Sequence, residues 1–272
     1  MYRDTVRKFL RESGLPFLIG TLTYEVGINP KDVALYNSAL LLDDQASASN
    51  SYFYDQRDLY SKVHLVPFGE YIPLNDRFPQ IGQMVGMGRN LTPGKSFRPL
   101  EIVPRVRAGA VICYEDVFPY VSRELARNGA NLLVVITNDA WYPLSDEPQQ
   151  HYVNSIFRTV ETRLPMIRCG NSDYSVLIDS TGKTVDSASF IMNGNKKILT
   201  PEKKQACSTV FQVPVPSAYA PTFYVRYGDL FVLFCWILFF CGFFFSCYQC
   251  FLYRKTLQAP FQEKLEDNAP LQ

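Results

Sequence analysis

An uncharged apolar run near the C-terminus constrains the fold of this chain more than any other feature. From Leu230 to Tyr253 the sequence has no charged residue, and the run is long enough to cross a hydrocarbon core of about 30 Å. A buried core helix would carry a polar stripe, and none is visible here. We therefore expect a transmembrane helix over residues 229–253. Arg254 and Lys255 follow it directly, which predicts that the residues before it lie outside the cytoplasm.

The part of the chain before this run has enough apolar material for a globular core. The whole chain has 272 residues, of which 47% are hydrophobic, and length alone suggests one or two domains. A formal net charge of +1, with no basic run, gives no electrostatic case for binding nucleic acid. Residues 1–12 read as an amphipathic helix and not as a signal peptide, because charged residues occur throughout the segment.

Cysteine and histidine are too few or too scattered for several classes of site. Four of the seven cysteines lie in the apolar run, which leaves Cys113, Cys169 and Cys207 widely spaced. Three such residues make neither a disulfide framework nor a Cys-x-x-Cys metal site. His64 and His151 are the two histidines, so a histidine-rich metal centre and a Ser-His-Asp triad are both poorly supplied. We expect no metal and no cofactor.

A buried strand that ends at a cysteine is the main candidate for catalysis. Residues 106–112 are mostly small or apolar, and they lead through Cys113 into Glu115, Asp116 and a helix-like segment. A strand that turns sharply into a helix presents a nucleophile beside backbone N–H groups that can stabilise an oxyanion. A lone cysteine at this position can equally be a small core residue.

The remaining pattern predicts alternating strands and helices. Two strands, 106–112 and 131–138, both end in polar residues, which places their ends on one rim of a sheet where α/β proteins bind ligands. Helices are expected at 118–128, with Gly129 as the C-terminal cap, and at 149–164, with Arg158 and Glu161 on the outside. Further strands are expected at 15–24, 36–42, 51–55, 174–179, 183–190 and 208–213.

Two irregular segments add candidate functions. Residues 60–73 carry Lys62 and Glu70 among prolines and a glycine, and charged side chains on irregular backbone suggest a site. The alternative is a solvated loop with a surface lysine. Residues 79–97 are rich in glycine and methionine, which fits either a mobile lid that touches lipid or an ordinary surface loop.

Lys62, Glu70, Cys113 and Glu115 together suit acyl transfer through a thioester. A thiol needs help to become a thiolate near neutral pH, and a lysine with a carboxylate partner can provide it. The lysine can also stabilise a developing oxyanion.

Three motifs resemble those of the apolipoprotein N-acyltransferase family, a membrane branch of the nitrilase (carbon-nitrogen hydrolase) superfamily. They are Lys-Val-His-Leu-Val-Pro-Phe-Gly-Glu-Tyr-Ile-Pro at 62–73, Ile-Cys-Tyr-Glu-Asp at 112–116, and Asn-Asp-Ala-Trp-Tyr at 138–142 followed by Gln150 and His151. The resemblance covers nearly the whole chain, and the terminal apolar run agrees with it.

The resemblance implies a fold, an activity and a set of site residues. The fold is an α/β, nitrilase-like α-β-β-α sandwich lacking its first strands, plus one C-terminal transmembrane helix. The activity moves an acyl chain from a phospholipid donor to the N-terminal amino group of a diacylglyceryl-cysteine lipoprotein, at the periplasmic side of the inner membrane. Cys113 resembles the nucleophile and Lys62 the catalytic lysine. Glu70 and Glu115 resemble supporting acids, and Tyr114 and Trp141 resemble substrate-binding residues.

Two departures from the family pattern affect the expected activity. The family's catalytic glutamate lies in a Pro-Glu motif upstream of the first helix seen here, so we expect this chain to be catalytically incomplete as given. Asp173 also replaces a family glycine, which puts the local turn in doubt. An amide hydrolase of the nitrilase type and an inactive membrane-tethered binding protein are the alternatives.

The expected domain division follows the same resemblance. Residues 1–213 form a partial nitrilase-like catalytic domain, 214–228 a linker, 229–253 the transmembrane helix and 254–272 a cytoplasmic tail.

Overall fold

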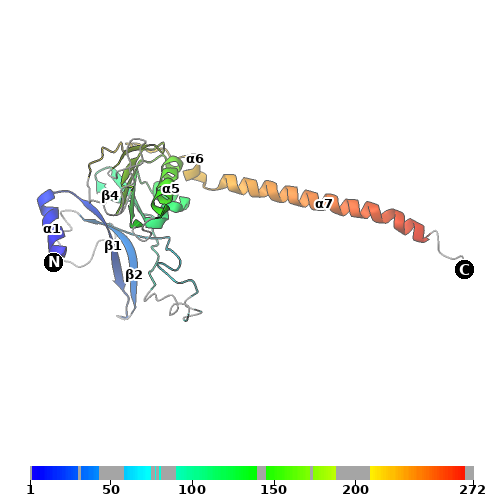
Figure 1. Cartoon of the computed structure of the whole chain (residues 1–272), viewed down its shortest axis with the longest axis horizontal. Helices are drawn as coiled ribbons and strands as arrows, with labels where there is room; N and C mark the ends of the chain where they lie inside the picture. Colours follow the sequence, from blue (N-terminus) through cyan, green and yellow to red (C-terminus); the bar gives the residue numbers. More distant parts are fainter. Residues whose placement is uncertain are drawn as a thin grey trace. The chain divides into compact units, whose positions relative to one another are not determined.

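The structure is a computed structural model that forms two compact units, Met1–Arg226 and Tyr227–Gln272. It describes residues 2–29, 32–42, 58–74, 77, 80, 90–139, 145–171, 174–187 and 209–266. The first unit holds the sheets and the shorter helices, and the second is dominated by one long helix, as Figure 1 shows. Each unit is described by itself.

The first unit is built on two sheets. The smaller sheet is antiparallel and has the order β1-β2-β3, from Phe17–Val26, Val33–Leu42 and Leu59–Ser61. The larger sheet has six strands in sequence order, with a parallel centre and antiparallel edges. Its strands are β4 (Leu100–Val103), β5 (Val106–Ile112), β6 (Leu132–Thr137), β7 (Met166–Gly170), β8 (Val176–Ile178) and β9 (Thr184–Ser187).

The two sheets share one core, with helices outside them. Buried side chains of the small sheet and of the large sheet belong to the same hydrophobic cluster, which also includes Leu125 of α4 (Pro119–Arg127). α5 (Glu147–Thr162) lies beside α4 over the large sheet, while α1 (Tyr2–Ser13) buries Leu10 at the N-terminal end. The predicted α-β-β-α fold class is therefore confirmed.

Three parallel strands bring their polar ends to one edge of the large sheet. Ile112 of β5 lies opposite Ile136 of β6, and Thr137 of β6 lies opposite Gly170 of β7. The residues after these strands, which include Cys113 and Asp139, consequently emerge side by side. This confirms the prediction that the two buried runs finish on one rim.

Most of the predicted elements that fall on described residues are present. The helix predicted at 118–128 is α4, and Gly129 ends it in the left-handed conformation with φ of 93°. No strand forms over 209–213, so that part of the last predicted strand is wrong. β3, β4 and β7 were not predicted. The expected strand at 51–55, Trp141, Asp173 and most of the glycine-rich segment at 79–97 lie outside the described residues.

The prediction that Arg158 of α5 faces outward is wrong. Arg158 is buried, and its Nη1 donates to the main-chain oxygens of Asp116 and Val117 at 2.9 and 3.0 Å. A prediction from hydrophobicity places a charged residue on the solvent side of a helix. Here the inward face of α5 meets main-chain carbonyl oxygens that need hydrogen-bond donors, and Arg158 supplies them. Phe157, the residue before Arg158 in the helix, is exposed to solvent.

The segment before the second unit packs onto the first. Tyr219 and Thr222 donate hydrogen bonds to main-chain oxygens at the C-terminal end of α5, at 2.7 and 2.6 Å, and Val225 of the short helix α6 (Phe223–Tyr227) is buried. The compact unit thus extends through most of the stretch that the sequence suggested as a linker.

The second unit is the helix α7 (Leu230–Glu266). Its segment from Leu230 to Arg254 is long and apolar enough to cross a membrane, and none of it is buried within the protein. Trp236 stacks on Phe240 along the helix surface, at 5.5 Å between ring centroids.

Candidate functional site

Cys113 sits in a strained turn directly after β5. Its φ of 52° lies in the left-handed region, which costs a residue with a side chain about 1–3 kcal/mol unless the surroundings hold it there. Cys113 opens the short 3-10 turn η2 (Cys113–Val117), and its thiol is free and half-buried. This is the geometry of a strand that turns abruptly to present a nucleophile.

The Glu115 carboxylate ties η2 to the segment that follows Lys62. Its Oε1 accepts hydrogen bonds from the main-chain N–H groups of Val63 at 2.7 Å and His64 at 3.0 Å, and its Oε2 accepts from Ile112 at 2.9 Å. The Tyr60 hydroxyl donates to both oxygens at 3.1 Å. Burial raises the pKa of Glu115, and the three main-chain hydrogen bonds oppose this. Through these hydrogen bonds, the Glu115 carboxylate holds η2 against the segment that follows Lys62.

Lys62 and Glu70 form a buried ion pair beside this anchor. The Lys62 side chain is 1% exposed, and its Nζ lies 2.9 Å from Oε1 and 2.8 Å from Oε2 of Glu70. Glu70 also accepts from the Asn37 side chain and from the main chain of Val66, both at 2.8 Å. An ammonium group has three N–H donors, and Glu70 takes up at most two of them. Within the described residues, at least one donor therefore remains for an oxygen or a thiolate.

Gly94 approaches the main chain of the Lys62 segment so closely that a side chain does not fit. Its N–H donates to the carbonyl oxygen of Lys62 at 2.7 Å, and an added Cβ would lie 2.0 Å from the carbonyl oxygen of Ser61. Gly94→Ala is therefore expected to displace Ser61 and Lys62 and to destabilise the fold by about 1–3 kcal/mol. Thermal unfolding of the full chain in detergent measures the loss.

Gly69→Ala is the matched control for this change, because the nearest atom to its added Cβ is a Val66 side-chain methyl at 3.3 Å. That methyl group can move, so a much smaller loss is expected. Equal melting temperatures for the two variants would contradict the close approach of Gly94.

Tyr114 is the exposed member of η2. Its ring packs edge-on against Phe118 at 5.5 Å and lies nearly parallel to the His151 ring at 5.9 Å, while 40% of the residue is open to solvent. Of the two predicted substrate-binding residues, Tyr114 therefore lies on the surface next to Cys113. Trp141 lies outside the described residues.

A buried group of four charged residues lies on the other side of η2. Arg168 of β7 is fully buried, and its guanidinium lies 3.0 Å from Asp116 and 2.7 Å from Asp139. His151 of α5 contacts the same two carboxylates, with Nε2 at 2.8 Å from Asp116 and Nδ1 at 3.3 Å from Asp139. Ser155 donates to Asp116 at 2.6 Å.

The two carboxylates set the protonation of His151. Burial alone lowers the pKa of His151, but its close contacts with the carboxylates of Asp116 and Asp139 outweigh burial and raise the pKa to about 9. For Asp139 the signs are reversed. Burial raises its pKa, but contacts with His151 and Arg168 outweigh burial, so the net shift of the pKa is downward. His151 and Asp139 are consequently both charged near neutral pH.

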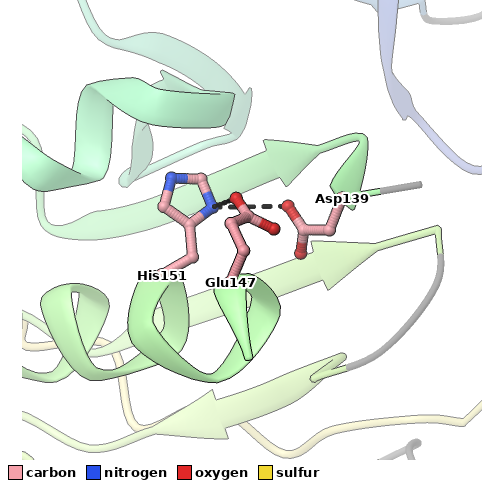
Figure 2. Close-up of side chains that lie close together, drawn as sticks. All are labelled: Asp139, Glu147 and His151. Atoms are coloured by element: carbon pink, nitrogen blue, oxygen red, sulfur yellow. Dashed lines mark hydrogen bonds and ion pairs between the residues drawn. The ribbon is translucent and has the colours of Figure 1, made fainter. Parts of the chain in front are cut away.

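Asp139, Glu147 and His151 also have the donor types of a metal site, with ligand atoms within 4.8 Å of one another (Figure 2). Figure 2 shows one ring nitrogen of His151 facing two carboxylates, that of Glu147, one turn earlier on the same helix, and that of Asp139, just after a strand. However, the Arg168 guanidinium lies 2.7 Å from Asp139 and 3.3 Å from Nδ1 of His151. Two of the three candidate ligands are therefore already engaged with a cation, and they form part of an ion-pair network.

The sequence did not single out this network. The sequence presents His151 as one of two histidines and as part of a family motif, and Arg168 lies in a strand that the hydropathy pattern does not reveal. The available signal was the arginine itself, placed between Ile167 and Cys169 in a run long enough for a strand. A charged residue in a buried strand requires buried counter-charges, and Asp116 and Asp139 follow neighbouring strands.

Comparison with known proteins agrees with this geometry. Residues 4–194 match the carbon-nitrogen hydrolase family. The chain is 32% identical over 234 residues to the apolipoprotein N-acyltransferase of Geobacter metallireducens, covering 86% of this chain and 40% of that protein. It is 35% identical over 240 residues to apolipoprotein N-acyltransferase 2 of Treponema pallidum, covering 85% and 39%. The chain thus spans about two fifths of the length of these relatives.

Among solved structures, Nit3 of Saccharomyces cerevisiae, a member of branch 10 of the nitrilase superfamily, aligns with a TM-score of 0.46 and 18% identity, over 68% of this chain and 60% of that one. Because the family match covers residues 4–194, most of the sequence, this chain belongs to the carbon-nitrogen hydrolase family.

Proposed function

We propose that this chain carries the acyl-transfer site of an apolipoprotein N-acyltransferase. The donor is a phospholipid, and the acceptor is the N-terminal amino group of a diacylglyceryl-cysteine lipoprotein. The similarity to named acyltransferases over 85% or more of the chain supports the substrate classes. The strained Cys113 turn, tied through Glu115 to the Lys62 segment, is the observation that carries the chemistry.

In the first step, the Cys113 thiolate attacks the ester carbonyl carbon of the phospholipid. The S–C bond forms, the ester C–O bond breaks, and the lysophospholipid leaves as an alcohol that carries the proton given up by the Cys113 thiol. The developing oxyanion needs a donor, and the remaining N–H of the Lys62 ammonium suits this role. Glu70 orients the Lys62 ammonium through both of its oxygens.

In the second step, the acceptor amine attacks the thioester carbon. The N–C bond forms, the C–S bond breaks, and the amine proton returns to the sulfur. Tyr114, exposed beside Cys113, is suited to contact the substrate at this stage. Glu115 and Glu70 act as positioning residues, since their oxygens are occupied by donors from the protein. Trp141 stays a predicted substrate contact.

A membrane location fits the proposed substrates. The segment Leu230–Arg254 would anchor the enzyme among its lipid donors, and the basic residues that follow favour a periplasmic catalytic part. In this proposal the residues up to 213 do the chemistry and those after 254 form a cytoplasmic tail.

The test is an acyl-transfer assay with a labelled phospholipid and a synthetic diacylglyceryl-cysteine peptide. Because the chain spans about two fifths of its relatives' length, the assay uses both the 272-residue chain and the complete open reading frame that encodes it. We expect the label to move to the peptide amine in at least one of the two. Absence of transfer in both would overturn the proposal.

An amide hydrolase is the second candidate, and the carbon-nitrogen hydrolase match over residues 4–194 favours it. It would release ammonia from simple amides without any lipid, whereas the proposed transferase depends on phospholipid. A protein that neither transfers nor hydrolyses, and in which Cys113 shows no enhanced reactivity, would be a membrane-tethered binding protein.

Removing the Lys62 charge should slow the first step. Lys62→Met is expected to lower the rate of acyl transfer about 10²-fold or more, because the oxyanion loses its charged donor. Lys95→Met, at an exposed position, is the matched control and should leave the rate unchanged. The measurement is the initial rate in the assay above. Equal rates for the two variants would exclude Lys62 from the site.

A further inference from the structure

The Cys113 turn is held from both sides by two adjacent buried acids. Glu115 points toward the Lys62 segment, and Asp116 points toward α5 and β7. Both residues are fully buried. The left-handed conformation of Cys113 is therefore kept by contacts on each side of η2, and the Asp116 side depends on charged partners.

We infer that His151 is a positioning residue, present as an imidazolium, that completes the charge network behind η2 and so fixes Cys113 and Tyr114. This inference rests on the proposed function, in which Cys113 is the nucleophile. It adds a residue that contacts neither reacting atom and acts only through the turn.

The contacts of the His151 ring favour the doubly protonated form. Nε2 lies 2.8 Å from Oδ1 of Asp116, and Nδ1 lies 3.3 Å from Oδ1 of Asp139. A neutral imidazole has one N–H and could donate to only one of these carboxylates. The neutral ring could accept from Arg168 at Nδ1, but its lone pair would then also face the Asp139 carboxylate.

The balance of charge points the same way. Asp116 and Asp139 carry two negative charges, and Arg168 supplies one positive charge. An imidazolium brings this buried group to zero, whereas a neutral ring leaves one uncompensated negative charge in the interior. Glu147 lies 3.9 Å from Nδ1, is 28% exposed, and adds a further negative charge at the rim.

The network reaches the exposed part of η2 through Tyr114. The Tyr114 ring lies nearly parallel to the His151 ring, with centroids 5.9 Å apart. A cation behind an aromatic ring attracts its face, so the imidazolium supports Tyr114 as well as Asp116. Cys113, between Tyr114 and β5, has its orientation set by both contacts.

The pH dependence follows from the raised pKa of about 9. Because the folded-state pKa lies above the value of about 6.5 in an unfolded chain, the contribution of His151 is fully present below pH 6.5 and is lost as the pH rises through about 9. The groups that face His151 are Asp116 and Tyr114 of η2, Asp139 after β6, Glu147 of α5 and Arg168 of β7.

The protonation state can be measured without any substitution. The chain has two histidines, so ¹⁵N-histidine labelling of the full chain in detergent gives two sets of ring nitrogen signals. At pH 7.5 we expect His151 to show two protonated nitrogens and His64 to be neutral, since burial and Lys62 lower the pKa of His64. A neutral His151 at pH 7.5 would overturn the inference.

The positioning role is measured by alkylation of Cys113 with iodoacetamide, resolved by peptide mass spectrometry. Cys169 of β7 is exposed and serves as the internal reference thiol. Relative to Cys169, we expect Cys113 in wild type to react about tenfold faster once the pH exceeds 9, as the turn loosens and exposes the sulfur. In His151→Gln, Cys113 should react at that faster rate already at pH 7.5. The further rise near pH 9 should occur in wild type and be absent from the variant.

Glu147→Gln is the control, because it changes a neighbouring charge at the rim and leaves the four-charge network intact. It should keep the wild-type profile. A wild-type profile with no transition near pH 9 would reject the positioning role, even if His151→Gln failed to fold. Neither measurement needs a lipid, so a failure of this inference can be distinguished from a failure of the proposed acyl transfer.

Discussion

Cys113→Ala is expected to lower the rate of acyl transfer at least about 10³-fold and to abolish the covalent intermediate. The reason is that no other described thiol shares the position of Cys113, in a left-handed turn at the sheet edge and close to the Lys62 segment. Intact-mass analysis after exposure to phospholipid should show an acyl adduct on wild type that hydroxylamine removes. The variant should show none.

Cys169→Ala is the matched control, since Cys169 is also free but points to solvent from β7. Its adduct and its transfer rate should equal those of wild type. An adduct that is labile to hydroxylamine and persists in Cys113→Ala would show that another group is the nucleophile. Both measurements use the chain and the complete open reading frame that encodes it.

Arg168→Met is expected to lower the free energy of unfolding by about 3–5 kcal/mol. Arg168 is fully buried between two carboxylates, so its loss leaves Asp116 and Asp139 with His151 as their one cationic partner in the described part of the chain. Methionine fills a similar volume, which limits the cavity contribution and isolates the effect of charge. Denaturant unfolding of the full chain in detergent measures the change.

Arg127→Met tests whether any lost arginine would have this effect. Arg127 lies on α4 with 51% of its side chain exposed and pairs with Glu124 at 3.1 Å. Exposed pairs of this kind contribute little, so a change within about 0.5 kcal/mol is expected. If Arg168→Met were as stable as Arg127→Met, the buried network would have no role in holding the fold.

The sequence allowed the architecture to be predicted wherever apolar runs were long. β5 and β6 are continuous buried strands, α4 has a regular apolar face with glycine at its end, and these elements were predicted close to their observed bounds. The hydropathy pattern is a sufficient guide where a segment is buried by apolar contacts alone. The turn at Cys113 was also predicted, because a buried run breaks there into charged residues.

The rest of the fold depends on polar burial, which hydropathy cannot detect. β7 was missed because Arg168 interrupts its apolar run, and β4 because four residues give too short a pattern. Arg158 was assigned to the wrong face of α5 for the same reason. At Arg158 and Arg168 the charge is buried because it meets specific partners that are remote in sequence.

The candidate site has one part that sequence motifs predict and another part that they do not. Lys62, Glu70, Cys113 and Glu115 stand in motifs, and the structure brings Lys62 against Glu70 and links Glu115 to both flanking segments. Whether these residues act as predicted stays a proposal. The network of Asp116, Asp139, His151 and Arg168 is contributed by four separate segments, so no local pattern could have indicated it.

The arrangement of Glu115 and Asp116 also determines how perturbations spread through the turn. In the described part of the chain, the partners of Glu115 and those of Asp116 have no residue in common. Free energies of interaction couple strongly only where partners are shared. The two halves of the site therefore meet in η2 itself, where the Tyr114 ring contacts Phe118 on one side and His151 on the other. A change in the Lys62 segment can reach α5 through this turn, without passing through a shared hydrogen-bond partner.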